Sequence, residues 1–439
     1  MPETVEKALE LKQKLIDFVY DAEGEMAIAL ESYAAAKGKH NSYGIKQQNL
    51  TIDLFTTAGN VNQQTPLEMF LASATDLDSQ ELELIRLWQG NFIGLFEIQA
   101  IETDSYQLMN WLTAKTYQVC GHSLLPEKET QRWQPGEIIL AILAPLDSAQ
   151  WFFFSDRIIK GRLSQPKLAV AIGEFRDNYP DFLYADAPEL LSQAWSSVAV
   201  YHQQFVEHFG SDHLTLPGYK LNQEIGKLQQ KMSQKKLAEA GIDSSKSLAD
   251  VLTEAGKEQA EFTEVAEDLG INAQAVDKLV ANQDKLSMAT PKLDLPPEIK
   301  QAETVTAYSH PKWGQMFLPG FDRFIDLLNS PGNSSEELSL LAGKYLEKPE
   351  ANYYVWQQLA QEYPSATEKV LQEHLKRNNF QLESDLADLL IEYNKPSTPE
   401  LPAIASVPIH LNNLFEAAVA QVQKTKSKSK KKKKKKGFQ

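Results

Sequence analysis

The stretch of the chain that decides the fold runs from Leu87 to Arg162 and reads LWQGNFIGLFEIQAIETDSYQLMNWLTAKTYQVCGHSLLPEKETQRWQPGEIILAILAPLDSAQWFFFSDRIIKGR. From Phe96 to Ala100 apolar and polar residues alternate, which is the period of a strand with one buried face. Turn-forming residues such as Pro135-Gly136 separate similar segments. We therefore expect five strands, near residues 96–100, 106–108, 116–120, 137–143 and 151–154.

Short strands joined by turns fit a small antiparallel barrel or curled sheet. The large aromatic residues available to fill it are Trp88, Phe92, Trp111, Trp133 and Trp151. On both sides of this stretch the apolar residues recur at helical spacing. The expected fold class is therefore α+β and mostly α-helical, with one small antiparallel β-barrel-like domain flanked by helical regions and a disordered basic C-terminal tail.

Helix-start signals and proline-rich linkers divide the chain further. Thr65-Pro66-Leu67-Glu68 has the pattern of a capping box with proline at the first helical position, and Asp78 to Glu81 begins another helix. Residues 288–297 and 394–408 are rich in proline, and the chain between Tyr308 and Tyr393 is expected to be helical. The expected parts are an N-terminal helical region (1–85), the β domain (86–162), a helical region (163–288), a C-terminal helical domain (298–393), a linker with a terminal helix (394–423) and the tail (424–439).

Length and cysteine usage limit the class of protein. The chain has 439 residues and one cysteine, Cys120, so it contains no intrachain disulfide and no four-cysteine zinc site. No apolar run reaches the length of a membrane-spanning helix, and the charged N-terminus lacks the apolar region of a secretory signal. We therefore expect a cytoplasmic protein without a transmembrane segment.

The charge of the chain is very unevenly distributed. The sequence has 44 basic and 59 acidic residues, a net charge of −15, but ten of its lysines lie in residues 424–439, where there is no acid. The other 423 residues therefore hold 34 basic against 59 acidic residues, a net charge of −25. An acidic body repels nucleic acid and anionic membranes, so contact with a polyanion has to come from the tail.

The lysine-rich tail, KTKSKSKKKKKKKGFQ, is the clearest functional signal. It has no apolar surface to bury and its like charges repel, so we expect it to be disordered. Lysines can bind phosphates of RNA or DNA with counterion release, or an anionic membrane face. The alternative is a solubilising tail that folds back on the acidic body. Without arginine or interleaved aromatics it is not expected to read bases. The predicted polyanion-binding residues are Lys424, Lys426, Lys428, Lys430, Lys431, Lys432, Lys433, Lys434, Lys435 and Lys436.

A second motif, at residues 261–280, has the spacing of a helix-turn-helix. Gly270 would make the turn, and Val276 and Leu279 would seat the second helix. Residues 261–286 carry six acids and only two lysines, and the second helix offers no arginine. Acidic residues beside phosphates are repulsive, so a small helical packing unit is the favoured interpretation. A nucleic-acid-associated regulator that uses this motif is the alternative.

No pattern in the sequence marks catalytic or metal-binding residues. Glycine-rich phosphate loops, the G-x-S-x-G elbow and the kinase motifs are absent. His202, His208 and His213, with Glu207 and Asp212, are candidate metal ligands, but their spacing does not place them on one helix face, and polar helix-end residues are the favoured interpretation. We therefore predict no catalytic residue, no metal site and no cofactor.

Aromatic residues are concentrated between His310 and Leu328. They fit a hydrophobic core, or a partner-binding surface if they remain exposed. The residues of the predicted partner surface are Trp313, Phe317 and Phe321.

Four runs resemble uncharacterised bacterial and cyanobacterial proteins, some of which end in a SEC-C-type zinc tail. The runs are FIGLFEI at Phe92–Ile98, WLTAKTYQV at Trp111–Val119, PGEIILA at Pro135–Ala141 and HPKWGQMFLP at His310–Pro319. The tail of this chain keeps lysines but has no cysteine, so neither zinc nor a SecB-like partner is carried over.

These observations favour a non-enzymatic cytoplasmic interaction or adaptor protein with a polyanion-binding tail. The polyanion would be RNA or an anionic membrane surface, and the protein partner of the body is not indicated. The first alternative is the nucleic-acid-associated regulator, and the second is an enzyme whose site is assembled from dispersed residues.

Overall fold

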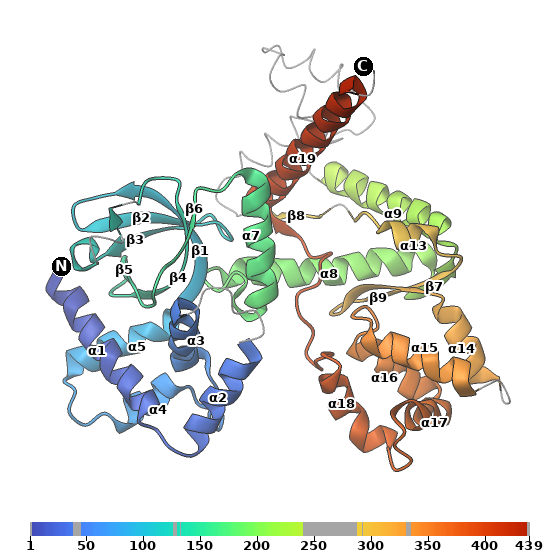
Figure 1. The fold of residues 1–439 in the computed structure, drawn as a ribbon, viewed down its shortest axis with the longest axis horizontal. Helices are drawn as coiled ribbons and strands as arrows, with labels where there is room; N and C mark the ends of the chain where they lie inside the picture. The colour runs from blue at the N-terminus through green and yellow to red at the C-terminus, as the bar shows by residue number, and fades with distance from the viewer. Residues whose placement is uncertain are drawn as a thin grey trace. The chain divides into compact units, whose positions relative to one another are not determined.

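The computed structural model describes residues 2–37, 45–125, 130–131, 133–239, 288–291, 293–330 and 335–436 (Figure 1). The chain forms two compact units, which are described separately. Unit 1 comprises Met1–Leu191 and Pro408–Gln439, and unit 2 comprises Ser192–Val407. The N-terminal helices, the β domain and the terminal helix thus belong to one unit, although the sequence suggested a separate region for each.

Unit 1 contains the expected barrel. All five predicted strands are present, and β3 has the predicted bounds. A sixth short strand, β6, was not predicted. The strands are β1 (Phe92–Ile101), β2 (Ser105–Asn110), β3 (Thr116–Cys120), β4 (Ile138–Pro145), β5 (Gln150–Phe153) and β6 (Ile158–Gly161).

The barrel closes because β4 pairs with β1 on one side and with β5 and then β6 on the other. The order around the barrel is β1-β2-β3-β5-β4 and back to β1. All of its pairings are antiparallel except that of β3 with β5, which is parallel. This connectivity is that of an OB-type barrel, a fold that supports many functions, so the function has to be argued from particular residues.

The barrel interior is filled by aromatic and branched side chains. Of the five aromatics expected there, Phe92, Trp133 and Trp151 belong to this core together with Phe96 and Tyr106. Trp88 is fully buried elsewhere, against Phe152 and Phe154. Trp111 instead donates a hydrogen bond from Nε1 to Glu97 at 2.9 Å.

Helices of the N-terminal segment pack beside the barrel in unit 1 (Figure 1). Both predicted helix starts are confirmed, because Thr65 and Asp78 form capping boxes with Glu68 and Glu81. The helices are α1 (Pro2–Tyr20), α2 (Glu25–Lys37), α3 (Ile45–Ala58), α4 (Pro66–Ser73) and α5 (Ser79–Leu87), and α7 (Gln165–Asn178) follows the barrel.

The terminal helix α19 (Ile409–Lys436) returns to unit 1 and packs against α7. Its backbone continues beyond Gln423, where the sequence predicted the helix to end. The side chains beyond Val422 lie outside the described part of the structure, so disorder of residues 424–439 stays a prediction.

Unit 2 contains a three-stranded sheet that the sequence did not predict. Its order is β10-β9-β7, with both pairings antiparallel. The strands are β7 (His213–Leu216), β9 (Val305–His310) and β10 (Gly314–Pro319), and two-residue strands lie at β8 (Met288–Ala289) and β11 (Val407–Pro408). The helices are α8 (Pro188–Phe209), which begins in unit 1, α9 (Gly218–Glu239), α13 (Pro297–Gln301), α14 (Phe321–Asn329), α15 (Ser335–Glu347), α16 (Tyr353–Glu362), α17 (Pro364–Leu375) and α18 (Leu382–Glu392).

The prediction of helix from Tyr308 onward was therefore wrong up to Pro319. Along β10, Met316 and Leu318 are buried in the core of unit 2, while Phe317 between them is half-buried. This period of two, with Gly314 in the left-handed region at φ +70°, makes a hairpin with β9. From Phe321 onward the predicted helices are present.

No described helix is both long and apolar enough to span a membrane. The motif at residues 261–280 lies outside the described residues.

A buried ion pair joins α1 and α3. Lys12 Nζ lies 2.7 Å from Asp53 Oδ1, and the Asp53 side chain is only 5 % exposed. Burial raises the pKa of Asp53 to about 6, against the opposing effect of Lys12 and with a smaller contribution from Asp156. Between pH 4 and 6, Asp53 is therefore protonated in the folded state but ionised in the unfolded state.

Because the folded pKa is the higher one, the contribution of Asp53 to stability is complete below its unfolded pKa and is lost as the pH rises through about 6. When the pH rises from 4 to 7, we expect the free energy of unfolding of Asp53→Asn to increase by about 1–3 kcal/mol relative to that of the wild type. Urea unfolding at several pH values measures this difference. Asp21→Asn, at an exposed position of the same segment, should run parallel to wild type. Parallel curves for Asp53→Asn and wild type would contradict the prediction.

The β9–β10 turn provides a test of close packing in unit 2. Gly314 and Gly210 have similar left-handed conformations, φ +70° and +74°, but a Cβ on Gly314 would lie 2.5 Å from Pro402 Cβ, whereas one on Gly210 would meet no atom within 4 Å. We expect Gly210→Ala to lower the free energy of unfolding by about 1 kcal/mol. Gly314→Ala should lower it by about 2–4 kcal/mol, because steric overlap adds to the backbone strain. If both variants lost the same free energy of unfolding, Pro402 would have to move away from the added methyl group without a measurable effect on stability.

Candidate functional site

The lysine tail follows the N-terminal part of α19, which packs within unit 1. We call this part of the helix, residues 409–422, the seat of the tail. Leu411, Leu414 and Ala418 are buried and recur at helical spacing, so one face of α19 is packed while α7 lies alongside. His410 Nε2 lies 2.8 Å from the main-chain oxygen of Trp111 in the β2–β3 turn. Burial lowers the pKa of His410, which favours a neutral imidazole that donates from Nε2. The tail is thus attached to the barrel through a fixed helix.

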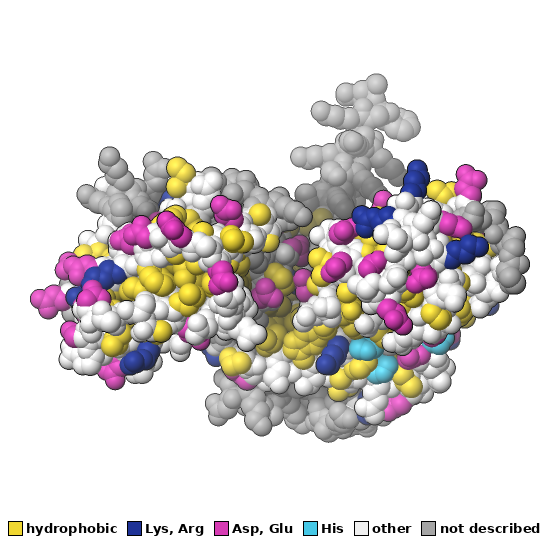
Figure 2. Space-filling view, turned by 90° about the horizontal axis from the view of Figure 1, so that it is seen from below, with side chains coloured by type: hydrophobic (Ala, Val, Ile, Leu, Met, Phe, Trp, Pro, Cys, Tyr) yellow, Lys and Arg dark blue, Asp and Glu magenta, His cyan; other side chains and the backbone are white. Residues whose placement is uncertain are grey.

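The predicted polyanion-binding lysines all follow this seat, and the backbone of α19 continues from Gln423 through all ten of them to Lys436. Nothing else in the described chain concentrates cations in this way. Figure 2 shows Asp and Glu side chains distributed over the visible face, with Lys and Arg dispersed among them. The tail is therefore the part of the sequence in which positive charge is concentrated.

The outward positions of β2 and β3 lack the groups that a nucleic acid requires. The exposed or half-buried positions of β2 and β3 are Gln107, Met109, Thr116 and Gln118, without a cation or an aromatic ring. The loops β1–β2 and β4–β5 carry Glu102, Asp104 and Asp147. Single-strand binding depends on cations along the backbone and on stacking platforms, so this face does not support it.

Cys120 ends β3 opposite Ser105, at the start of β2, and is 4 % exposed. Burial raises the pKa of its thiol, and Asp104 and Asp147 add to the effect. A buried, protonated thiol is a poor nucleophile, which fits the interpretation of Cys120 as a core residue.

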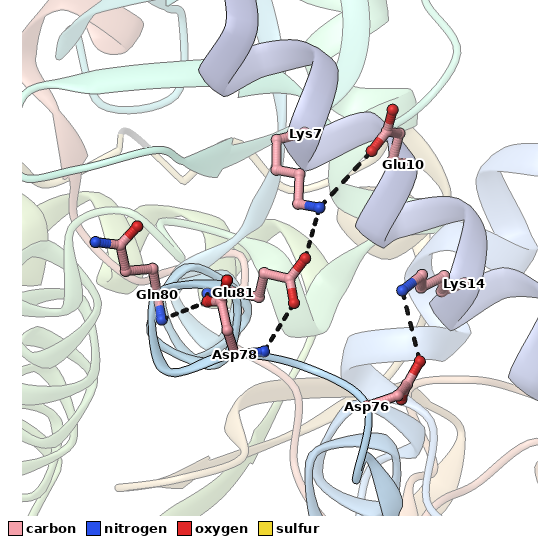
Figure 3. Close-up of polar contacts among 7 residues, drawn as sticks. All are labelled: Lys7, Glu10, Lys14, Asp76, Asp78, Gln80 and Glu81. Atoms are coloured by element: carbon pink, nitrogen blue, oxygen red, sulfur yellow. Dashed lines mark hydrogen bonds and ion pairs between the residues drawn. The ribbon is translucent and has the colours of Figure 1, made fainter.

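An open groove of about 540 Å³ lies between the N-terminal turns of α1 and α5 in unit 1. Its lining includes Glu3, Lys7, Asp78, Glu81 and Leu84. Figure 3 shows how the charged groups around it meet from the two helices.

Several charged groups at this groove are engaged with one another. Lys7 Nζ lies 2.5 Å from Glu81 Oε1, and the other carboxylate oxygen of Glu81 accepts from the Asp78 amide at 2.8 Å (Figure 3). The hydrogen bond between Lys7 and Glu81 raises the pKa of the lysine and lowers that of the carboxyl. Lys14 and Asp76 form a further ion pair at 3.6 Å (Figure 3). These contacts join α1 to α5 and to the segment that precedes α5.

A second polar cluster is centred on Asp186, just before α8. Its Oδ2 accepts hydrogen bonds from Tyr117 Oη at 2.6 Å, Thr113 Oγ1 at 2.8 Å and Asn110 Nδ2 at 3.0 Å. Lys115 Nζ donates to the main-chain oxygen of Asp186 at 2.7 Å. Burial raises the pKa of Tyr117, and the Asp186 carboxylate raises it further. Asp186 thus fastens the segment before α8 to the β2–β3 end of the barrel.

We expect Asp186→Asn to lower the free energy of unfolding by about 2–3 kcal/mol, because three donors would lose a charged acceptor. Asp177→Asn, at an exposed position of α7, should change it by less than about 0.5 kcal/mol. Urea unfolding of both variants measures the difference, and a neutral Asp186→Asn would mean that the three donors find other acceptors.

The candidate metal ligands of residues 202–213 do not converge. His208 faces Glu224 at 3.8 Å, and His213 Nδ1 lies 2.8 Å from Asp212 Oδ1. His202 instead contacts Ser309 Oγ at 3.3 Å and lies 6.5 Å, between ring centroids, from His310. Among the described residues no group of three or more His, Cys, Asp or Glu side chains is arranged to hold a metal ion.

The contact between His202 and Ser309 does not make an active site. Ser309 is 2 % exposed, so its hydroxyl is closed to a substrate, and its partner is Nδ1 of the imidazole. His310 is the residue of this region that the sequence analysis missed, although the turn signal His-Pro-Lys-Trp-Gly surrounds it.

The predicted partner surface is only partly available. Phe321 is 1 % exposed and belongs to the core of unit 2, so it cannot contribute. Trp313 and Phe317 are half-buried, and the Trp313 ring stacks on Tyr353 with centroids 6.3 Å apart.

Comparisons of the chain with protein-family models, with curated proteins and with solved structures found no match.

Proposed function

We propose that the chain is a non-enzymatic interaction protein that attaches itself to a polyanion through its lysine tail. The observation that carries the proposal is the seat of α19, because a helix packed on α7 and bonded to Trp111 leads directly into ten lysines. A cytoplasmic location fits the single, buried cysteine.

Charge supports the tail as the attachment point. The rest of the chain carries a net charge of −25, which repels RNA and anionic lipid alike. Binding through lysines alone would be electrostatic and independent of base sequence. Because α19 packs on α7 and contacts Trp111, a tail bound to a polyanion would localise unit 1 at that polyanion.

The polar clusters of both units support a non-enzymatic role. In the groove between α1 and α5, in the Asp186 cluster and at the contact of His202 with Ser309, donors and acceptors pair with one another, although Asp186 Oδ1 is buried without a hydrogen-bond partner among the described residues. Each of these contacts joins two elements of the fold.

The test compares three proteins: the full chain, a truncation after Gln423, and a full-length variant in which all ten lysines between Lys424 and Lys436 are replaced by Gln. Each is titrated with bulk RNA, duplex DNA and liposomes of anionic or neutral lipid at about 50 and 200 mM salt. We expect the full chain to lose on the order of 10³-fold in affinity over this range of salt, as binding through about six phosphate contacts does. The other two proteins should bind none of the ligands.

The Gln variant is the matched control, because it keeps the length of the tail and removes only its charge. Binding by the Gln variant would show that the lysines are not the cause. If the full chain binds no anionic ligand at either salt concentration, the proposal fails and the tail is a solubilising segment. If the truncation still binds duplex DNA, the motif at residues 261–280 becomes the first candidate.

A further inference from the structure

The turn between β9 and β10 in unit 2 is closed by one imidazole. His310 Nδ1 accepts hydrogen bonds from the amides of both Lys312 and Trp313, each at 3.1 Å. An imidazole nitrogen can accept only while it is unprotonated, so this geometry requires neutral His310 with its proton on Nε2. The turn therefore depends on the protonation state of a residue that titrates near neutral pH.

The surroundings of His310 disfavour its charged form. The ring packs on Tyr354 of α16, with centroids 4.4 Å apart, and faces His202 of α8 at 6.5 Å. Desolvation lowers the pKa of His310, His202 and Lys312 lower it further, and Asp212, which precedes β7, opposes them. If Nδ1 carried a proton in the closed turn, it could no longer accept hydrogen bonds from the amides of Lys312 and Trp313. Its own N–H would then face these two N–H groups.

The closed turn also positions an aromatic side chain. Trp313 follows the turn and stacks on Tyr353. Gly314, the next residue, lies against Pro402 and Ile404. If the two amides lose their acceptor, the position of the Trp313 ring is no longer fixed from the β9 side.

We propose that His310 is a pH-sensitive latch: neutral His310 holds the β9–β10 turn closed and Trp313 on Tyr353, and protonation of Nδ1 opens the turn. The latch lies in unit 2 and is independent of the lysine tail.

The sign follows from the lowered pKa of His310. The closed turn resists protonation, whereas an open turn binds a proton with the ordinary affinity of histidine, so closure is favoured above about pH 6.5 and is lost as the pH falls below it. At pH 5 the population of the open turn can rise by up to about 30-fold over its value at pH 7.5.

Hydrogen exchange of the Lys312 and Trp313 amides in the full chain, corrected for the intrinsic effect of pH, measures this opening. In the wild type we expect exchange to accelerate between pH 7.5 and pH 5, by up to about 30-fold. His310→Ala should exchange fast at both values, since it has no acceptor. His310→Asn should stay protected at both, because Asn Oδ1 accepts from the same two amides in an Asx turn but does not titrate.

His213→Asn is the matched control, because it removes a neighbouring imidazole and keeps His310. It should respond to pH as the wild type does. Wild-type amides with the same protection at both pH values would overturn the proposal. So would a pH response in His310→Asn equal to that of the wild type, which would assign the opening to another titrating group such as His202 or Asp212.

Discussion

The pairing of β1 with β4 is the interaction on which unit 1 depends. It runs without a break from Phe92 opposite Leu143 to Glu97 opposite Ile138, and every residue of β4 is buried. Because β2 and β5 are hydrogen-bonded to the other edges of these strands, the pairing turns an open sheet into a barrel. The other segments of unit 1 contact the outside of that barrel. Trp88 packs on Phe152 and Phe154, Asp186 accepts hydrogen bonds at the β2–β3 end, and His410 contacts Trp111.

Much of this barrel could be predicted because its signals are local. Alternation along β3 and the capping boxes at Thr65 and Asp78 involve residues a few positions apart. The parallel contact of β3 with β5 has no local signature, since it pairs Gln118 with Gln150 across the whole β4 strand. Closure of the sheet therefore had to come from the structure.

The β9–β10 hairpin shows how a local pattern misleads. Trp313, Met316 and Phe317 have the spacing of one helix face, and the aromatic residues of α14 continue it. The chain nevertheless changes direction at Gly314, and Met316 and Leu318 alternate into the core. Pro311 and Pro319, at the two ends of the segment, were the signals that favoured strands and turns over helix.

The polar clusters show the same division between local and distant signals. The lysine tail is contiguous and could be recognised at once, whereas Asp186 meets Asn110, Thr113 and Tyr117 from far along the chain. No spacing rule brings such residues together. His310 is an intermediate case, because its amide partners are its near neighbours and only its imidazole environment depends on α8 and α16.

The chain order of unit 1 has a consequence for its synthesis. Residues 192–407 lie between the part of unit 1 that contains α7 and the part that contains α19. A growing chain exposes the barrel early, but the face of α7 that α19 covers stays open until residues 192–407 and then the start of α19 have been synthesised. The lysines follow α19 in the sequence, so a chain that has not yet been synthesised beyond Gln423 carries the acidic body without them. Attachment to a polyanion would then begin only after the residues of unit 2 have been made.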